Sequence, residues 1–74
     1  MDSAADIGAR IAAWRKARGL TPRELAESIG VSAAAVYQWE GTGSSHTLPS
    51  MTNLFKIAGV LGVTMERFFA KKVT

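Results

Sequence analysis

Apolar residues recur along this chain at the spacing of a helix. Ile7, Ile11 and Trp14 lie four and three positions apart, so they fall on one helical face, and similar spacings recur in later segments. The alternating β-branched pattern of a strand is absent from the sequence apart from isolated valines. The pattern therefore predicts an all-α fold with five helices, at about residues 5–18, 22–29, 33–40, 51–61 and 65–70.

Residues that favour helix ends stand at most of these boundaries. Thr21, Pro22 and Glu24 have the order of an N-cap, a first-turn proline and the acid of a capping box. Further N-caps are expected at Ser32, Ser50 and Thr64, and helix-ending glycines at Gly19, Gly30 and Gly62. Only Val31 separates Gly30 from Ser32, so the third helix has to turn sharply across the second.

The segment from Pro22 to Trp39 has the spacing of a helix-turn-helix. Ala26 is small where two helices must cross closely, Gly30 supplies a left-handed turn, and Val36 fills the wedge between the helices. The apolar set is completed by Leu25, Ile29, Val31 and Trp39. Trp14 and Trp39 lie at helical spacing with other apolar residues, which favours core packing over a role as stacking platforms for single-stranded DNA.

Length and charge narrow the class of protein. A chain of 74 residues forms a single domain, residues 1–74, and without cysteine it has no disulfide or thiolate metal site to stabilise it. The N-terminal ten residues are too polar for a signal peptide, and no apolar run reaches the roughly 18 residues of a membrane span, so we expect a cytoplasmic protein. The formal charge of +3 favours an anionic partner.

Two stretches of the chain resemble a known family: IGARIAAWRKARGLTPRELAESIGVSAAAVYQWE and the later PSMTNLFKIAGVLGVTMERFF. They are similar to lambda-repressor-like helix-turn-helix proteins, also called the Cro/cI or Xre type, over nearly the whole chain. The resemblance implies a compact five-helix DNA-binding domain whose third helix enters the major groove, with dimers reading half-sites about one helical turn apart. The implied function is a sequence-specific transcriptional regulator that binds a palindromic double-stranded DNA operator. It would be a Cro/cI-like phage or prophage repressor, or the DNA-binding part of a longer one.

The same resemblance assigns individual residues. Carried over by position, the base-reading residues are Ala33, Ala34, Tyr37 and Gln38. It also implies an ion pair between Arg15 and Glu40 that fixes the first helix against the third, and an arginine fork suits a carboxylate. Contacts to DNA phosphates are expected from Arg10, Thr21, Arg23, Ser32, Thr42, Ser44 and His46.

The run SAAAVYQWE places alanines where base-reading side chains are expected. The methyl groups of Ala33 and Ala34 can contact the C5-methyl group of thymine, and small residues let a helix sit deep in the groove. Gln38 can pair with adenine through two hydrogen bonds, and Tyr37 can reach a phosphate or a thymine methyl group. We therefore expect specificity to rest on Gln38 with apolar help.

The chain departs from the family pattern at two places. Pro22 stands where the family usually has a glutamine that meets a phosphate, and it removes both that side chain and its backbone N–H. No Lys or Arg lies between Glu24 and Asn53, so positive charge must come from the first two helices, at Arg10, Arg15, Lys16, Arg18 and Arg23. We expect a weaker salt-dependent contribution to DNA affinity than is usual for the family.

Other functions fit the sequence less well. The same departures are compatible with a protein-interaction or antitoxin-like module that keeps the fold but has lost base readout. An enzyme is not expected, because Ser44 and His46 have no orienting acid, and neither a metal site nor a cofactor or small-molecule ligand is expected. A homodimer on DNA is expected, with a seam formed by apolar residues in excess of the core, namely Val60, Met65, Phe69 and Val73.

Overall fold

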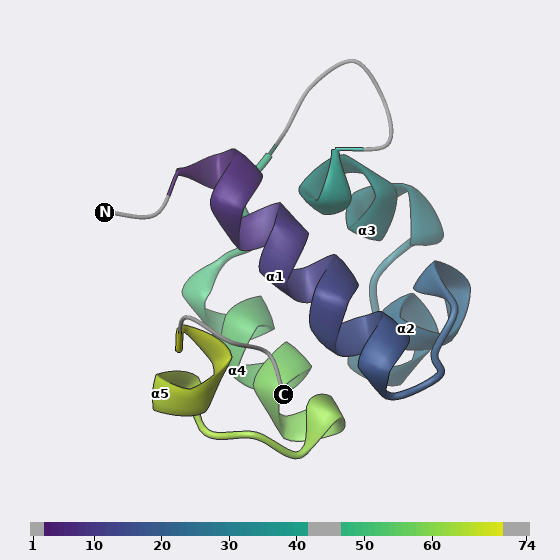
Figure 1. Ribbon diagram of the computed structural model, residues 1–74. Coiled ribbons are helices and arrows are strands. Elements are labelled where there is room, and N and C mark those ends of the chain that lie inside the picture. Colours follow the sequence, from purple (N-terminus) through teal and green to yellow (C-terminus); the bar gives the residue numbers. More distant parts are fainter. Residues whose placement is uncertain (1–2, 42–46, 71–74) are drawn as a thin grey trace.

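Five helices make up the computed structural model, which describes residues 3–41 and 47–70 (Figure 1). They are α1 (Ala4–Ala17), α2 (Pro22–Ile29), α3 (Ala33–Glu40), α4 (Met51–Leu61) and α5 (Met65–Phe68). No strand occurs within the described residues, so the predicted all-α fold with five helices is confirmed. None of the helices in these two ranges is both long and apolar enough to cross a membrane.

The last helix is shorter than the sequence predicts. The expected range was 65–70, but α5 ends at Phe68, and Phe69 has left the helical conformation with φ −93° and ψ 5°. The carbonyl of Ala70, just beyond this end, accepts a hydrogen bond from Nη1 of Arg10 on α1. The chain end of α5 is therefore held by a side chain from another helix instead of by further helical turns.

Side-chain caps begin all five helices. The predicted capping box at α2 is confirmed: Thr21 Oγ1 accepts from the Glu24 N–H at 3.1 Å, and Glu24 Oε1 accepts from the Thr21 N–H at 2.9 Å. A second capping box, which the sequence analysis missed, joins Ser3 and Asp6 at the start of α1. The remaining helices begin at the predicted N-caps, Ser32, Ser50 and Thr64. These caps satisfy N–H groups that have no partner within their own helices.

The turn between α2 and α3 is set by a glycine. Gly30 has a φ of 77° and ψ of 32°, a left-handed conformation that other residues adopt at a steric cost. The next N–H, that of Val31, donates to the carbonyl of Ala26 at 3.0 Å, and Ser32 then caps α3. The predicted helix-turn-helix is present, with three residues between the two helices.

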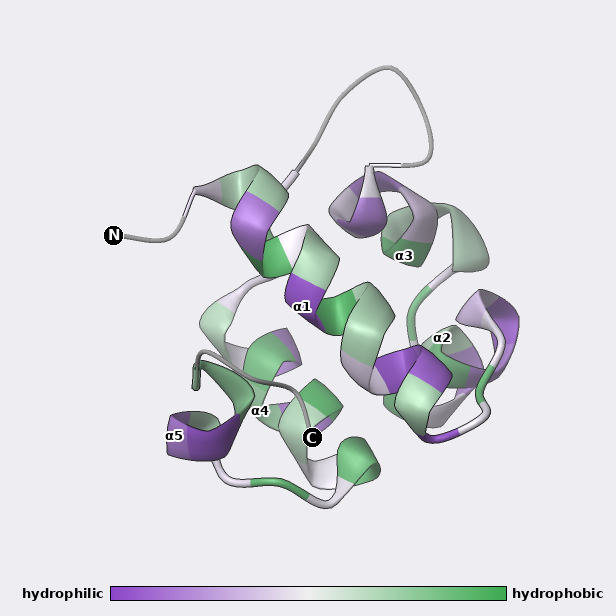
Figure 2. Ribbon diagram, viewed as in Figure 1, coloured by the Kyte–Doolittle hydropathy of each residue, from purple (hydrophilic) through white to green (hydrophobic). Residues whose placement is uncertain are grey.

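One hydrophobic core joins all five helices. Its side chains are at most 7% exposed: Ile11, Trp14, Leu25, Ala26, Ile29, Val36, Trp39, Leu54, Ile57, Ala58, Leu61 and Phe68. Hydrophobic and hydrophilic residues alternate along α1 and α4, as expected for helices with one buried face (Figure 2). Both tryptophans belong to this core, which confirms the packing role expected for them.

α1 lies against the C-terminal end of α3 at very short range. Gly8 of α1 is buried, and a Cβ atom at this position would lie 2.0 Å from the main-chain oxygen of Trp39. Real Cβ atoms do not approach other atoms so closely, so only glycine fits here. The absence of a side chain at Gly8 therefore allows α1 and α3 to pack this closely.

Candidate nucleic-acid interface

The outer surface of α3 carries three of the four expected base-reading residues. Ala34, Tyr37 and Gln38 are exposed, and the Tyr37 side chain is 42% accessible. Ala33 differs from the expectation, because it is half-buried and packs against the core. The surface that α3 offers to a partner therefore consists of Ala34, Tyr37 and Gln38, with Ala33 at its edge, and it has no formal charge.

The opposite face of α3 anchors this surface to the molecule. Val36 is fully buried and Trp39 is 5% exposed, one on each turn of the helix. The helix begins where Ser32 Oγ accepts from the Ala35 N–H at 3.2 Å and ends at Gly41, which has a left-handed φ of 75°. Just past its end, the Thr47 N–H donates to the Gln38 carbonyl at 3.3 Å. Both ends of α3 are thus fixed relative to the core.

Arg15 on α1 and Glu40 on α3 form the predicted ion pair. Arg15 Nε donates to Glu40 Oε2 at 2.8 Å and Nη2 donates to Oε1 at 2.9 Å, the two-bond geometry of an arginine fork. The third donor, Nη1, reaches the carbonyl of Leu20 at 2.8 Å. The side chains are only 10% and 6% exposed, and the hydrogen bonds to Glu40 raise the pKa of Arg15. This pair ties the end of α3 to α1 and to the turn before α2.

The N-terminus of α2 offers few groups to a phosphate. Pro22 has no N–H, and the capping box uses the N–H groups of Thr21 and Glu24. What remains is the Thr21 hydroxyl hydrogen, together with the main-chain N–H and the guanidinium of the exposed Arg23. The Glu24 carboxylate places a negative charge at the same helix end, which favours the helix but opposes a phosphate. Arg23 is therefore the main cationic group on this side of the helix-turn-helix.

Two arginines expected to supply positive charge for DNA lie elsewhere. Arg10 is half-buried and donates to the Ala70 carbonyl beyond α5. Arg18 Nε donates to the Leu61 carbonyl at the end of α4 at 2.8 Å. Arg18 is exposed, as Lys16 and Arg23 are, but its guanidinium is held at the end of α4. Of the residues expected to contact phosphates, Arg10 therefore already binds a carbonyl group within the fold.

The remaining expected contacts involve the N-cap of α3 and the segment after it. The Ser32 hydroxyl oxygen accepts from the Ala35 N–H, so its hydrogen is still available to a phosphate. Thr42, Ser44 and His46 lie outside the described residues. Within residues 3–41 and 47–70, no three His, Cys, Asp or Glu side chains gather in the way a metal ion requires.

Sequence reasoning missed two features of the structure, of which the first positions α3. One is Gly8, whose signal was a glycine inside an otherwise favourable helix, where it costs about 1 kcal/mol relative to alanine. The other is the placement of Arg18 and Arg67 around Trp14, with guanidinium carbons 5.1 and 5.9 Å from the ring centroid. This second arrangement has no local sequence signal, because Arg67 lies 53 positions after Trp14.

Comparison with known proteins agrees with this geometry. The helix-turn-helix family profile matches residues 11–68, which is most of the chain and includes α2, the turn and α3. The chain belongs to the helix-turn-helix family. A curated relative, the cryptic phage CTXphi transcriptional repressor RstR of Vibrio cholerae, is 34% identical over 68 residues, or 92% of this chain. The chain spans 58% of the length of that repressor.

Solved structures of this family have the same arrangement of helices. The biofilm master regulator SinR in complex with DNA superposes with a TM-score of 0.74 at 34% identity, covering 86% of this chain and 98% of that one. The N-terminal DNA-binding domain of SinR from Bacillus subtilis has a TM-score of 0.70 at 32% identity, covering 92% and 96%. The lambda-repressor-like resemblance is therefore confirmed. The comparisons support the function expected from the sequence, that of a DNA-binding transcriptional regulator.

Proposed function

We propose that this helix-turn-helix domain binds duplex DNA sequence-specifically, with α3 in the major groove, and regulates transcription by occupying an operator. The observation that carries the proposal is the exposed, uncharged surface of α3, held rigidly by the Arg15–Glu40 pair and by the burial of Trp39. A major groove about 12 Å wide admits one α-helix. No catalytic step is part of this function.

Base readout in this proposal is divided between one polar group and two apolar ones. Gln38 pairs with N6 and N7 of an adenine, which discriminates against other bases by about 1 to 3 kcal/mol. The Ala34 methyl group contacts a thymine methyl group, and Tyr37 reaches either a thymine or a phosphate. The half-buried Ala33 contributes at most the edge of its methyl group. The preferred half-site therefore contains A·T pairs opposite the second turn of α3.

Phosphate contacts in this proposal come from groups beside the helix-turn-helix. Arg23 at the start of α2 supplies the main charge, and the hydroxyl groups of Thr21 and Ser32 supply hydrogen bonds. Each neutralised phosphate steepens the decrease of affinity with salt, and few such cations face this side. The protein thus depends on base contacts for a larger share of its affinity than a strongly basic DNA-binding protein does.

We further propose that two copies bind adjacent half-sites of a palindromic operator and block RNA polymerase. RstR is named as a phage transcriptional repressor, which favours repression over activation for this chain too. The seam expected at Met65 and Phe69 is less suitable, because both side chains are half-buried and pack against the core. Val73 lies outside the described residues, and among residues 3–41 and 47–70 the large apolar side chains that stay exposed for a contact between copies are Leu48, Met51, Phe55 and Val60.

Those exposed apolar residues also favour a second candidate, a protein-interaction module with weak base readout. Met51 and Phe55 lie one turn apart on α4 and are 63% and 58% exposed. Salt separates the two functions, because DNA affinity decreases steeply as salt rises, whereas an apolar contact between proteins barely responds.

The experiment that tests the proposal is a selection of binding sites from random duplex DNA at physiological salt. Enrichment of an inverted repeat is the expected result, with specific binding at least about a thousandfold tighter than non-specific binding. Gln38→Ala should then lose about tenfold or more in discrimination at one base pair of each half-site. Glu66→Ala, on the exposed face of α5, is the matched control and should keep the same consensus. A folded protein that enriches no sequence contradicts the proposal.

A further inference from the structure

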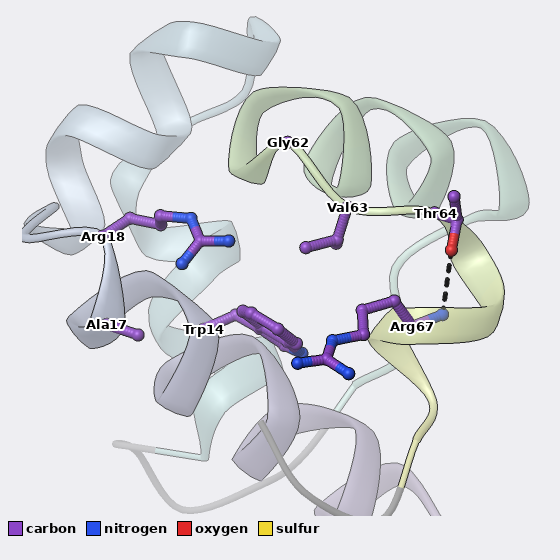
Figure 3. Close-up of a pocket in the computed structure, with 7 residues that line it drawn as sticks. All are labelled: Trp14, Ala17, Arg18, Gly62, Val63, Thr64 and Arg67. Atoms are coloured by element: carbon purple, nitrogen blue, oxygen red, sulfur yellow. Dashed lines mark hydrogen bonds between the residues drawn. The ribbon is translucent and has the colours of Figure 1, made fainter. Parts of the chain in front are cut away.

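A cleft between the end of α1 and α5 is lined by two arginines (Figure 3). It lies between the end of α1, the turn from α4 to α5, and α5 itself. Arg18 comes from the end of α1 and Arg67 from α5, and both point towards Trp14 in the floor of the cleft. Neither α2 nor α3 contributes a lining residue, so this cleft is distinct from the proposed DNA-binding surface.

Arg18 is held in a fixed orientation on one side of the cleft. Its Nε donates to the Leu61 carbonyl at 2.8 Å, and its guanidinium carbon lies 5.1 Å from the centroid of the Trp14 ring. A guanidinium placed over a ring keeps the N–H groups at its edge available for other partners. The two terminal nitrogens of Arg18 are therefore donors whose position is set before any ligand arrives.

Arg67 approaches the same ring from α5. Its guanidinium carbon lies 5.9 Å from the ring centroid. The start of α5 is fixed by Thr64, whose Oγ1 accepts from the Arg67 N–H at 3.0 Å, and Trp14 Nε1 donates to the Phe68 carbonyl at 3.4 Å. Trp14 is only 2% exposed, so its role is to position the two guanidinium groups and not to stack on a ligand.

Within residues 3–41 and 47–70, no carboxylate compensates the two positive charges. None of the residues lining the cleft is acidic, and the neighbouring Glu66 is not among them. Among the residues that the structure describes, neither Arg18 nor Arg67 forms an ion pair. Two like charges close to one ring repel each other, and this repulsion is relieved when an anion binds between them.

We propose that the Trp14 cleft, defined by Arg18, Arg67, Trp14 and Val63, binds a small dianion through a phosphate or a pair of carboxylates. Two planar guanidinium groups match the arrangement of oxygens in a phosphate or a carboxylate. Hydrogen bonds between such oppositely charged groups are stronger than those between neutral groups. The cleft takes a free small molecule in this proposal, not an acidic side chain of another protein. The inference does not rest on DNA binding, because it uses none of the residues of α2 or α3.

The test is a titration of the whole chain followed by two-dimensional nitrogen–proton NMR at constant ionic strength. Inorganic phosphate and succinate are the probes, and chloride and acetate are the monovalent controls. Saturable shifts at millimolar concentration are expected for the Gly62 and Val63 amides, the Arg18 Nε–H and the Trp14 indole N–H. Shifts that stay linear with concentration, or that chloride reproduces, overturn the proposal.

Two variants distinguish binding of the anion in the cleft from a general effect of the protein's net charge. Arg67→Gln should bind phosphate roughly tenfold more weakly, the loss expected for one charge-assisted hydrogen bond. Lys56→Gln removes the same charge from the exposed face of α4, outside the cleft, and should change the affinity less than about twofold. Equal losses in the two variants contradict the assignment.

Two further controls address misfolding of the Arg67 variant and binding of an acidic peptide in place of a small free anion. If Arg67→Gln fails to fold, Arg67→Lys keeps the charge but loses the planar fork, and an intermediate affinity is expected. An unchanged affinity for Arg67→Lys overturns the two-guanidinium geometry. A tetraglutamate peptide is the third probe. Saturation by this peptide without saturation by phosphate or succinate overturns the assignment to a small free anion.

Discussion

Gly8 of α1 faces the main-chain carbonyl of Trp39 on α3 so closely that a Cβ atom at Gly8 would lie 2.0 Å from the carbonyl oxygen. The same atom would lie 3.1 Å from the Trp39 carbonyl carbon and 3.3 Å from the Glu40 Cα. All three neighbours are backbone atoms, which cannot rotate away as a side chain can. The separation between α1 and α3 is therefore fixed by a residue that has no side chain.

Gly8→Ala should destabilise the protein, because α3 has to move away from α1 to make room for the methyl group. Overpacking costs about 1 to 3 kcal/mol, and contact with backbone atoms puts this site at the upper end. Gly59→Ala is the matched control, since Gly59 is helical, exposed and has no atom within 4 Å of an added Cβ. That control should gain about 0.5 to 1 kcal/mol. Urea unfolding followed by circular dichroism measures both, and equal stability of the two variants contradicts the account of Gly8.

Glu40→Ala should destabilise the protein more than removal of the whole ion pair does. The single change leaves the Arg15 guanidinium buried with only the Leu20 carbonyl as a partner, which costs about 3 to 5 kcal/mol. The double variant Arg15→Met with Glu40→Leu removes both charges and fills the space with apolar side chains. Its free energy of unfolding should therefore decrease less than that of Glu40→Ala. The free energy of unfolding of the two variants tests this prediction. An osmolyte can be added to both samples if either variant is too unstable to fold without it. A double variant less stable than Glu40→Ala contradicts this prediction.

The capping box of α1 should make stability depend on pH in the acid range. Hydrogen bonds from the Ser3 N–H and hydroxyl lower the pKa of Asp6 below its ordinary value of 3.8. Because the pKa of Asp6 is lower in the folded than in the unfolded protein, its contribution to stability is fully present at pH values above the unfolded pKa. This contribution is lost as the pH falls through the pKa of the folded state. Asp6→Asn should therefore be less stable than the parent at pH 6, and the difference should disappear towards pH 2.

Thermal unfolding at several pH values checks the role of Asp6. Glu27→Gln removes a negative charge from an exposed position of α2 that belongs to no capping box, so it is the matched control. A pH-dependent difference of the same size for Glu27→Gln would attribute the effect to net charge and not to the cap.

Arg23→Gln should weaken DNA binding about equally for all sequences. Because Arg23 is the main exposed cation at the start of α2, its loss should reduce the slope of log affinity against log salt by about one. Lys56→Gln should leave the slope unchanged. Titrations of one enriched site and one scrambled site at several salt concentrations measure both quantities. A selective loss at the enriched site alone would make Arg23 a base-reading residue.

Local signals explain why so much of the fold was predictable. Caps act on N–H groups two or three residues away, so Thr21, Ser32, Ser50 and Thr64 could be recognised from their immediate neighbours. The buried faces of α2 and α4 follow from helical spacing alone. The Arg15–Glu40 pair is a contact between distant residues, and it was predicted only because the chain resembles a family in which that pair is expected.

Contacts between distant residues without such a precedent were not predictable. Nothing in the sequence around Arg10 indicates that its guanidinium reaches the Ala70 carbonyl, and the expected contact of Arg10 with a DNA phosphate stays a prediction. Helical spacing and the family resemblance both put Ala33 on the outer face of α3, but at the edge of a helical face a small rotation decides burial, and Ala33 is half-buried.

The eight residues of α3 divide between two faces. Val36 and Trp39 belong to the core, whereas Ala34, Tyr37 and Gln38 are exposed and lie outside it. Substitutions at these three positions leave the packing of the domain intact, since no cavity opens beneath them. In the proposed mode of DNA binding, the two copies that follow a gene duplication can therefore diverge in the sequences they recognise through single codon changes, while each intermediate protein still folds.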